Sequence, residues 1–277
     1  MKARKIASNT VIYLLYALTF ITFAIPIYWA FVTSIKQPTE LFANPPVWFT
    51  LHPTIEHYIT VVQQSKLVQG FSNSLVLSLA TTIITTVLAT FAAYGFSRYE
   101  FRGKDSVLNV LLVTRMLPAA ILMIPLYSML NSLHMLNTRQ GLIFVYTSIN
   151  IPFSVWILKT FFDSIPVSLD EAAMIDGCNM WQAFWQVIMP LVKPGIVASA
   201  VLAFFSCWNE FLLALVLTST NDVQPLSIVL RGLMSEQGVK WGMMMAGGCL
   251  AIFPPALFFI IFQKHFIVGI TGGAVKG

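Results

Sequence analysis

The sequence predicts an all-α polytopic membrane protein with six transmembrane helices. Apolar residues make up 57% of the 277-residue chain and charged residues only 10%, whereas soluble domains carry about 25% charged residues. The apolar residues also gather in continuous runs of the length that a helix needs to cross a bilayer, about 20 residues. Because these runs are continuous and do not alternate with polar residues, they favour helices over the strands of a barrel.

Six runs meet this length, and they predict a single transmembrane domain over residues 1–277. The first run follows three positive charges and exceeds the apolar core of a signal peptide, which is about 7–15 residues, so we expect it to be retained as a helix. Prolines within the later runs predict kinks. The expected spans are 11–33, 71–97, 107–130, 139–161, 195–218 and 241–263.

The basic residues predict that both termini are cytoplasmic. With the N-terminus inside, ten of the sixteen Lys and Arg residues fall on the inner side and five on the outer side. Cytoplasmic loops are enriched in these residues. The remaining one, Arg115, lies within the third span, where we expect a contact with a carbonyl or a buried partner more than a place on a cavity wall. This orientation makes 162–194 the longest cytoplasmic connection.

The first part of this connection predicts a short helix that ends at a glycine. Ser168 and Glu171 have the spacing of a capping box, so we expect the helix to begin near Leu169. Gly177 suits the left-handed residue that follows many helices. The helix therefore has about two turns and a length of roughly 12 Å.

The second part predicts another helix and then an interruption. Asn179 and Gln182 repeat the cap-like spacing, so a helix is expected to begin near Met180. Pro190 and Pro194 are expected to break or bend the chain before the fifth span. On physical grounds alone, this insert either receives a partner surface or lies flat against its own bundle, and the capping pattern does not choose between the two.

The connection resembles the EAA loop of ABC importer permeases. The stretch "EAAMIDG", which begins at Glu171, and the downstream "IMPLVKPG" match the pattern of that loop. The stretches "NTRQGLIFVY", "WNEFLLAL" and "GITGGAVKG" resemble the carbohydrate-uptake branch of the same family. The resemblance covers roughly residues 70–277 and implies the type I importer fold with cytoplasmic EAA coupling helices.

This resemblance implies that the chain works with partners in a bacterial or archaeal cytoplasmic membrane. They are a second homologous permease, a dimer of ATP-binding-cassette ATPases, an extracytoplasmic solute-binding protein and membrane lipid. The residues implied to couple to the ATPase are Glu171, Ala172, Ala173, Asp176 and Gly177. The residues implied to touch it from the C-terminal tail are Thr271, Gly272, Gly273, Val275 and Lys276.

The chain itself is expected to be a non-catalytic subunit. It lacks the G-x-x-x-x-G-K-[ST] phosphate loop, because Gly103 and Lys104 are followed by Asp105 and have no upstream glycine. We therefore expect ATP and magnesium to be held by the partner ATPase, with no cofactor bound here. The four histidines and three cysteines show no metal-ligand spacing, and no clustered basic face indicates a nucleic acid.

Polar residues inside the spans are the candidates for the substrate pathway. An aromatic ring beside hydrogen-bonding side chains suits a sugar, and the resemblance places the fifth span near the path. The alternative is that these residues pack or bond between helices, which contributes about 0.6–2 kcal/mol. The candidates are Trp208, Asn209, Glu210, Tyr127 and Asn150.

The sequence thus predicts a permease subunit that imports a sugar or sugar-like solute by alternating access. Another solute class, such as glycerol phosphate, also fits the branch. A stand-alone secondary transporter fits less well, because such proteins often carry inverted repeats and intramembrane ionisable chains. A membrane-embedded enzyme is disfavoured because no catalytic constellation of His, Cys and carboxylate is present.

Overall fold

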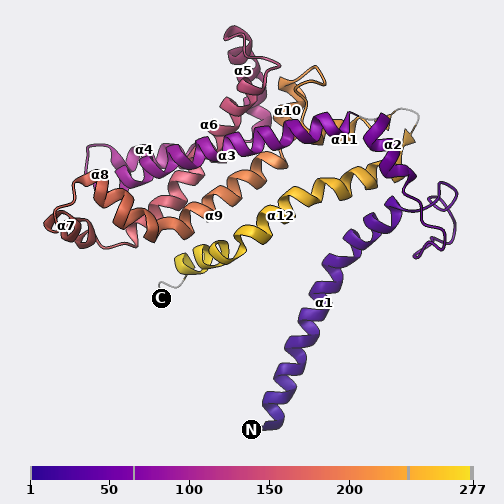
Figure 1. The fold of residues 1–277 in the computed structure, drawn as a ribbon, viewed down its shortest axis with the longest axis horizontal. Helices are drawn as coiled ribbons and strands as arrows, with labels where there is room; N and C mark the ends of the chain where they lie inside the picture. The colour runs from indigo at the N-terminus through magenta and orange to yellow at the C-terminus, as the bar shows by residue number, and fades with distance from the viewer. Residues whose placement is uncertain (1, 65, 236–237, 275–277) are drawn as a thin grey trace. The chain divides into compact units, whose positions relative to one another are not determined.

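The computed structural model describes residues 2–64, 66–235 and 238–274, and most of them are helical. Figure 1 labels the elements in chain order. They are α1 (Lys2–Ser34), α2 (Glu56–Gln64), α3 (Leu67–Arg98), α4 (Lys104–Met116), α5 (Ala119–Ser132), α6 (Arg139–Asp163), α7 (Ser168–Ile175), α8 (Met180–Gln182), the π-helical turn η1 (Ala183–Ile188), α9 (Met189–Trp208), α10 (Leu212–Leu217), α11 (Leu226–Arg231), β1 (Met234–Ser235), β2 (Gly238–Val239) and α12 (Trp241–Ala274).

The structure has five to six candidate membrane helices, in line with the predicted six. Within the described residues, five helices are long and apolar enough to cross a bilayer, and the bent pair of α4 and α5 supplies a sixth candidate. The chain divides into two compact units. The first unit comprises residues 1–68 and 229–252, and the second comprises 69–228 and 253–277.

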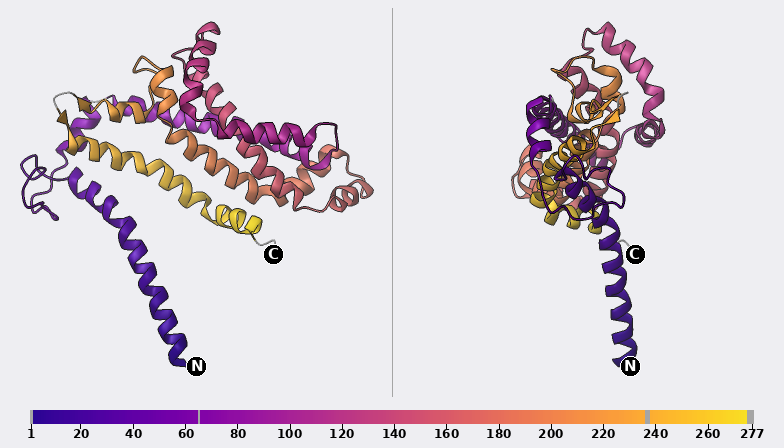
Figure 2. Two further views of the ribbon diagram at one scale, coloured as in Figure 1. Left: turned by 180° about the vertical axis from the view of Figure 1, so that it is seen from behind. Right: turned by 90° about the vertical axis from the view of Figure 1, so that its right-hand side faces the viewer.

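The third span was predicted as one helix over 107–130, and this prediction is wrong. α4 ends at Met116, α5 begins at Ala119, and the two helices are bent by 102°. The residue before a proline is pushed out of the helical region. Leu117 precedes Pro118 and has an extended backbone (φ −71°, ψ 123°), which turns the chain. Figure 2 shows the two helices diverging at this corner.

The second unit is built around α3, α6 and α9, which run side by side (Figure 1). Buried aliphatic and aromatic side chains from these helices and from η1 form one cluster near the end that carries α7. Close packing is possible because Gly195 of α9 lies directly against the ring of Phe161 in α6. The buried members are Ala89, Ala93, Val155, Leu158, Phe162, Ile165, Phe184, Ile188 and Val192.

The fifth span was predicted over 195–218, but the continuous helix ends at Trp208. Asn209 has a non-helical backbone, and a separate short helix, α10, begins at Leu212. Leu213, Ala214 and Leu217 of α10 are buried, and α10 packs beside α5. The segment therefore bends back into the unit where a straight span was expected.

The first unit holds α1, α2, the β1–β2 hairpin and the first turns of α12. Lys36 follows α1 and is buried with its ammonium 4.0 Å from the Trp29 ring centre. Burial lowers the pKa of Lys36, and the Glu40 carboxylate opposes this shift. The Nε2 atom of His57 lies 2.9 Å from the Lys36 carbonyl oxygen, and its ring packs directly on Gly242.

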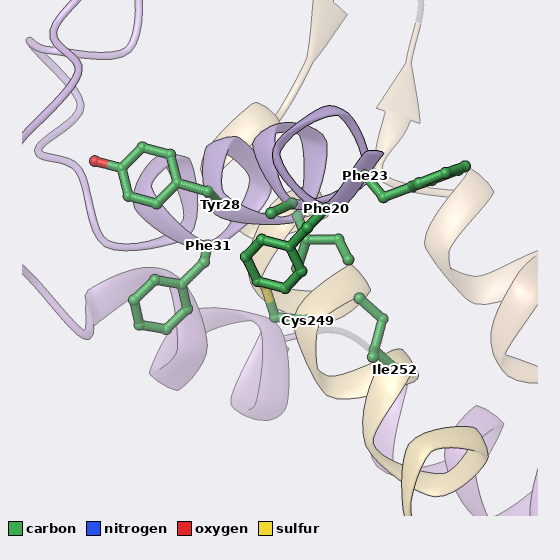
Figure 3. Close-up of a pocket in the computed structure, with 8 residues that line it drawn as sticks. Phe20, Phe23, Tyr28, Phe31, Cys249 and Ile252 are labelled. Carbon is green, nitrogen blue, oxygen red and sulfur yellow. The ribbon is translucent and has the colours of Figure 1, made fainter. Parts of the chain in front are cut away.

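An open apolar pocket of about 610 Å³ lies in this first unit. Figure 3 shows Phe20, Phe23, Tyr28 and Phe31 of α1 with Cys249 and Ile252 of α12. Val32, Thr33 and Ser34 at the end of α1 are buried, but the most apolar stretch of this span has no residue buried within the chain. This helix therefore presents its apolar surface to lipid or to another subunit.

Candidate functional site

The α7–α8 turn places the predicted coupling residues at one end of the second unit (Figure 1). α7 spans Ser168–Ile175, close to the predicted position, but the predicted capping box is wrong. Val167 is the N-cap residue and no side chain caps the helix. The carbonyls of Pro166 and Val167 accept the N–H groups of Leu169 and Asp170 at 3.1 and 2.9 Å. A tight backbone turn thus replaces the side-chain cap.

The end of α7 is a complete Schellman motif, as the sequence predicted for Gly177. Gly177 has φ +93°, and a Cβ there would meet no atom within 4 Å. The N–H of Cys178 bonds to the Ala173 carbonyl at 3.0 Å, and the N–H of Gly177 bonds to the Met174 carbonyl at 3.1 Å. This pair of bonds defines the motif. The turn therefore needs glycine for its backbone, not for space.

The second helix begins as the sequence predicted, but it is not interrupted by proline. Asn179 and Gln182 form a reciprocal capping box at the start of α8. The Met189 N–H then bonds to the Phe184 carbonyl, five residues earlier. This wide π turn accommodates Pro190, so the helix continues to Trp208 without the break that was one of the two expected outcomes.

α7 buries one face and exposes the other. Among the coupling candidates, Ala173 is buried, whereas Glu171, Ala172, Asp176 and Gly177 are exposed. The two alanines therefore differ, because Ala173 packs inward while Ala172 faces outward. Ile175 is 85% exposed on the outer side, whereas Met174 is 50% exposed and lines a small pocket with Asp170 and Tyr94.

A buried ion pair fastens α7 to the end of α3, and sequence reasoning missed it. The Nε atom of Arg98 donates to Asp170 Oδ2 at 2.8 Å, with side-chain exposures of 6% and 10%. The Tyr94 hydroxyl donates to Asp170 Oδ1 at 3.2 Å. Arg98 Nη1 and Nη2 also donate to the carbonyls of Phe162 and Ile165. These residues lie more than 60 positions apart, so no local pattern joins them.

An aromatic group holds α8 and η1 against the same part of α3. Phe91 of α3 stacks on Phe184 at 5.7 Å and meets Trp181 and Trp185 edge-on. Tyr94 also packs on Phe184 at 4.8 Å. Such pairs contribute about 0.5–1.5 kcal/mol each beyond area burial. Both halves of the coupling insert therefore rest on α3.

The predicted ATPase-contacting tail lies at the limit of the described residues. α12 continues to Ala274, so the backbone of Thr271, Gly272 and Gly273 is helical. Val275 and Lys276 lie outside the described residues.

The candidate pathway residues of the fifth span have two kinds of environment. Glu210 Oε1 accepts the Leu213 N–H at 2.8 Å, and Oε2 accepts the Ala214 N–H at 3.0 Å and the Tyr146 hydroxyl at 2.9 Å. Its carboxylate therefore caps α10. Asn209 is exposed, and its amide donates to the Phe205 carbonyl.

The other pathway candidates are dispersed. Trp208 is buried and packs edge-on against Phe71, and Asn150 is buried with its amide bonded to the Tyr146 carbonyl. Tyr127 is 43% exposed on α5.

Arg115 lines a cavity of about 540 Å³ between α4, α5 and α6. Its Nη1 donates to the Ile149 carbonyl at 3.2 Å, and its guanidinium lies 5.5 Å from the Phe153 ring. The expected carbonyl contact is present, and the side chain is also exposed.

The family follows from a comparison with known proteins. Residues 85–271 match the family described as "Binding-protein-dependent transport system inner membrane component". The chain belongs to this family. The matched region contains the α7–α8 turn, the fifth span and most of α12, so it includes the whole candidate site on α3, α7 and α8.

Two relatives and one solved structure place this inner-membrane component more closely. It is 31% identical to the diacetylchitobiose uptake system permease protein DasC of Streptomyces coelicolor, over 93% of this chain and 94% of the relative. It is 34% identical to the trehalose transport system permease protein SugB of Mycobacterium tuberculosis, over 91% and 92%. Its fold is similar to a chain of a bacterial ABC transporter that imports alginate (TM-score 0.79, 22% identity), over 94% of this chain and 98% of that one.

The chain is therefore an ABC importer permease, and its membrane fold is mainly helical, as expected. As a family member, it is a multi-pass component of the inner membrane.

Proposed function

We propose that this permease imports a sugar or a sugar-like solute by alternating access, driven by separate ATPase subunits. The relatives that transport diacetylchitobiose and trehalose support the solute class. The family description supports a solute-binding protein as the donor of that solute. In the proposed orientation both termini and the α7–α8 turn are cytoplasmic.

The observation that carries this proposal is the two-sided character of α7. Its inner face is fixed by Asp170 and Ala173, while its outer face presents Ile175, at 85% exposure, and Ala172 beside acidic Glu171. Large apolar side chains exposed on a short rigid helix are typical of a surface that enters a partner groove. A flat-lying insert would bury these side chains against its own bundle.

The remaining site assignments extend this proposal. Glu171, Ala172, Asp176 and Gly177 form the contact with the ATPase, and Ala173 sets the close packing beneath them. The C-terminal tail makes a second contact with the ATPase dimer, which holds ATP and magnesium. A second permease completes the transport path, and the unburied span of α1 packs against it or against lipid.

The solute path is proposed to run along the α9–α10 break. Asn209 and Tyr127 are exposed and are available to a sugar hydroxyl or ring face. The polar atoms of Glu210 and Asn150 are hydrogen-bonded within the chain. These two residues therefore hold the helices that line the path and do not contact the solute. Trp208 packs behind the same break.

The test is reconstitution of the permease pair with its ATPase and its binding protein in liposomes. We expect import of the sugar that the binding protein carries, strictly dependent on ATP and on that protein. The isolated chain is expected to show neither ATP hydrolysis nor import. Import by the isolated chain, or import that is independent of ATP, would refute the proposal.

A further inference from the structure

Short covalent segments join α7 to α6 and to α8, the elements that precede and follow it in the chain. Contact between α7 and α3 is made by side chains alone. Residues 164–167 connect α7 to α6, and residues 176–179 connect it to α8. α3 ends at Arg98, far earlier in the sequence, so no covalent connection makes it follow α7. Any motion of α7 that moves the second span must pass through noncovalent contacts.

Arg98 gathers three helix ends at one guanidinium. Its Nε atom bonds to Asp170 in the first turn of α7. Its Nη1 and Nη2 atoms bond to the Phe162 and Ile165 carbonyls, at and just after the end of α6, at 3.1 and 3.2 Å. The last carbonyls of a helix lack partners within it, and a basic side chain satisfies them well. The planar guanidinium fixes the directions of these bonds.

Both carboxylate oxygens of Asp170 are bonded to α3, one to Arg98 and one to Tyr94. The pair is almost fully buried, so separating it would leave two poorly solvated charges without their partner. A second bond supports the junction, because the Ser97 hydroxyl donates to Asp163 Oδ1 at 2.7 Å. α3, the end of α6 and α7 therefore share one rigid joint.

We propose that the Arg98–Asp170 pair is the link through which motion of α7 drives α3. Arg98 acts as a positioning residue: it touches neither the solute nor the ATPase, and it makes the second span move with the coupling helix. This inference rests on the proposed function, and it assigns to α3 the role of a driven element. Without the link, α7 follows its partner while α3 lags behind.

Two variants of the reconstituted transporter test the link. Asp170→Asn removes one charge and leaves Arg98 in place. The double variant Arg98→Met, Asp170→Leu removes both charges, and replacing a buried pair by apolar residues is often neutral for stability. Glu100→Gln is the matched control, because Glu100 pairs with Lys104 at the same end of α3 on an exposed surface.

The measurement is the number of solute molecules imported per ATP hydrolysed, at equal amounts of assembled complex. We expect this ratio to fall about 3- to 30-fold in both variants, the range that mutations along a coupling route produce. The control is expected to keep the wild-type ratio. A purely structural role would lower the amount of assembled complex and leave the ratio unchanged.

A wild-type ratio in the double variant would overturn the inference. Failure of both variants to assemble would also overturn it, because a link needed only for transmission is not needed for assembly. Failure of the proposed function has a different signature: the wild-type complex itself would then show no import dependent on ATP and the binding protein.

Discussion

Replacing Gly177 by alanine is expected to separate ATP hydrolysis from solute import. The free-energy cost follows from the backbone alone, since Gly177 has φ +93° and its surroundings are open. A left-handed backbone costs a residue with a Cβ about 1–2 kcal/mol. This cost lowers the population of the intact Schellman turn about 5- to 30-fold relative to opened turns, which loosens the end of α7.

The assay uses the reconstituted complex and records import and ATP hydrolysis in the same vesicles. We expect Gly177→Ala to retain hydrolysis and to import less solute per ATP. Gly103→Ala introduces the same kind of strain at φ +85° between α3 and α4, and Gly95→Ala adds a methyl group inside α3 where nothing lies within 4 Å. Both controls are expected to keep the wild-type ratio.

The reasoning fails if Gly177→Ala imports as much solute per ATP as the wild type. It also fails if Gly103→Ala lowers that ratio equally, because the effect would then come from general strain and not from the coupling turn.

Three further predictions concern the membrane helices. Glu210→Gln is expected to lower thermal stability in detergent by about 1.5–3 kcal/mol, because the charged cap of α10 is lost; impaired import with unchanged stability would instead indicate a direct role in the path. Gly195→Ala is expected to destabilise the protein by about 1–3 kcal/mol through overpacking on Phe161, and Phe161→Leu in the same chain should recover most of that loss in a thermal melt. Arg115→Met is expected to change stability by no more than about 1 kcal/mol, because one lost hydrogen bond is offset by removal of a charge from an apolar setting, and import assays should find the variant active.

The sequence predicted those features whose cause is local. Continuous apolar runs indicated the helices, and Gly177 and Asn179 marked the end of α7 and the start of α8. The start of α7 was predicted to within a residue, but its side-chain cap at Ser168 was mispredicted, because backbone carbonyls, which leave no sequence signature, took the place of that cap. Pro118 was expected to kink the third span, but the continuous apolar run gave no sign that the helix would end at Met116 and turn by 102°.

Features that depend on distant residues were not predictable in this way. In the sequence, Arg98 was only one of the basic residues used to predict the orientation of the spans. Asp170 was only the residue before the EAA stretch. Their pairing emerges when α3 and α6 pack through Ala93 and Phe162. Glu210 likewise suggested a polar path residue, because the sequence did not show that α10 would begin two residues later and need an acceptor for its free N–H groups.

The residue after Gly177 gives the transporter a natural attachment point for a probe. Cys178 is half-exposed at this turn. Cys207 is buried, and Cys249 lines the apolar pocket beside α1. A water-soluble thiol reagent should therefore mark the turn in the unmodified chain. With the proposed ATPase contact at this turn, the intensity of a fluorophore placed there is expected to change in each transport cycle, which would give an optical signal of the cycle.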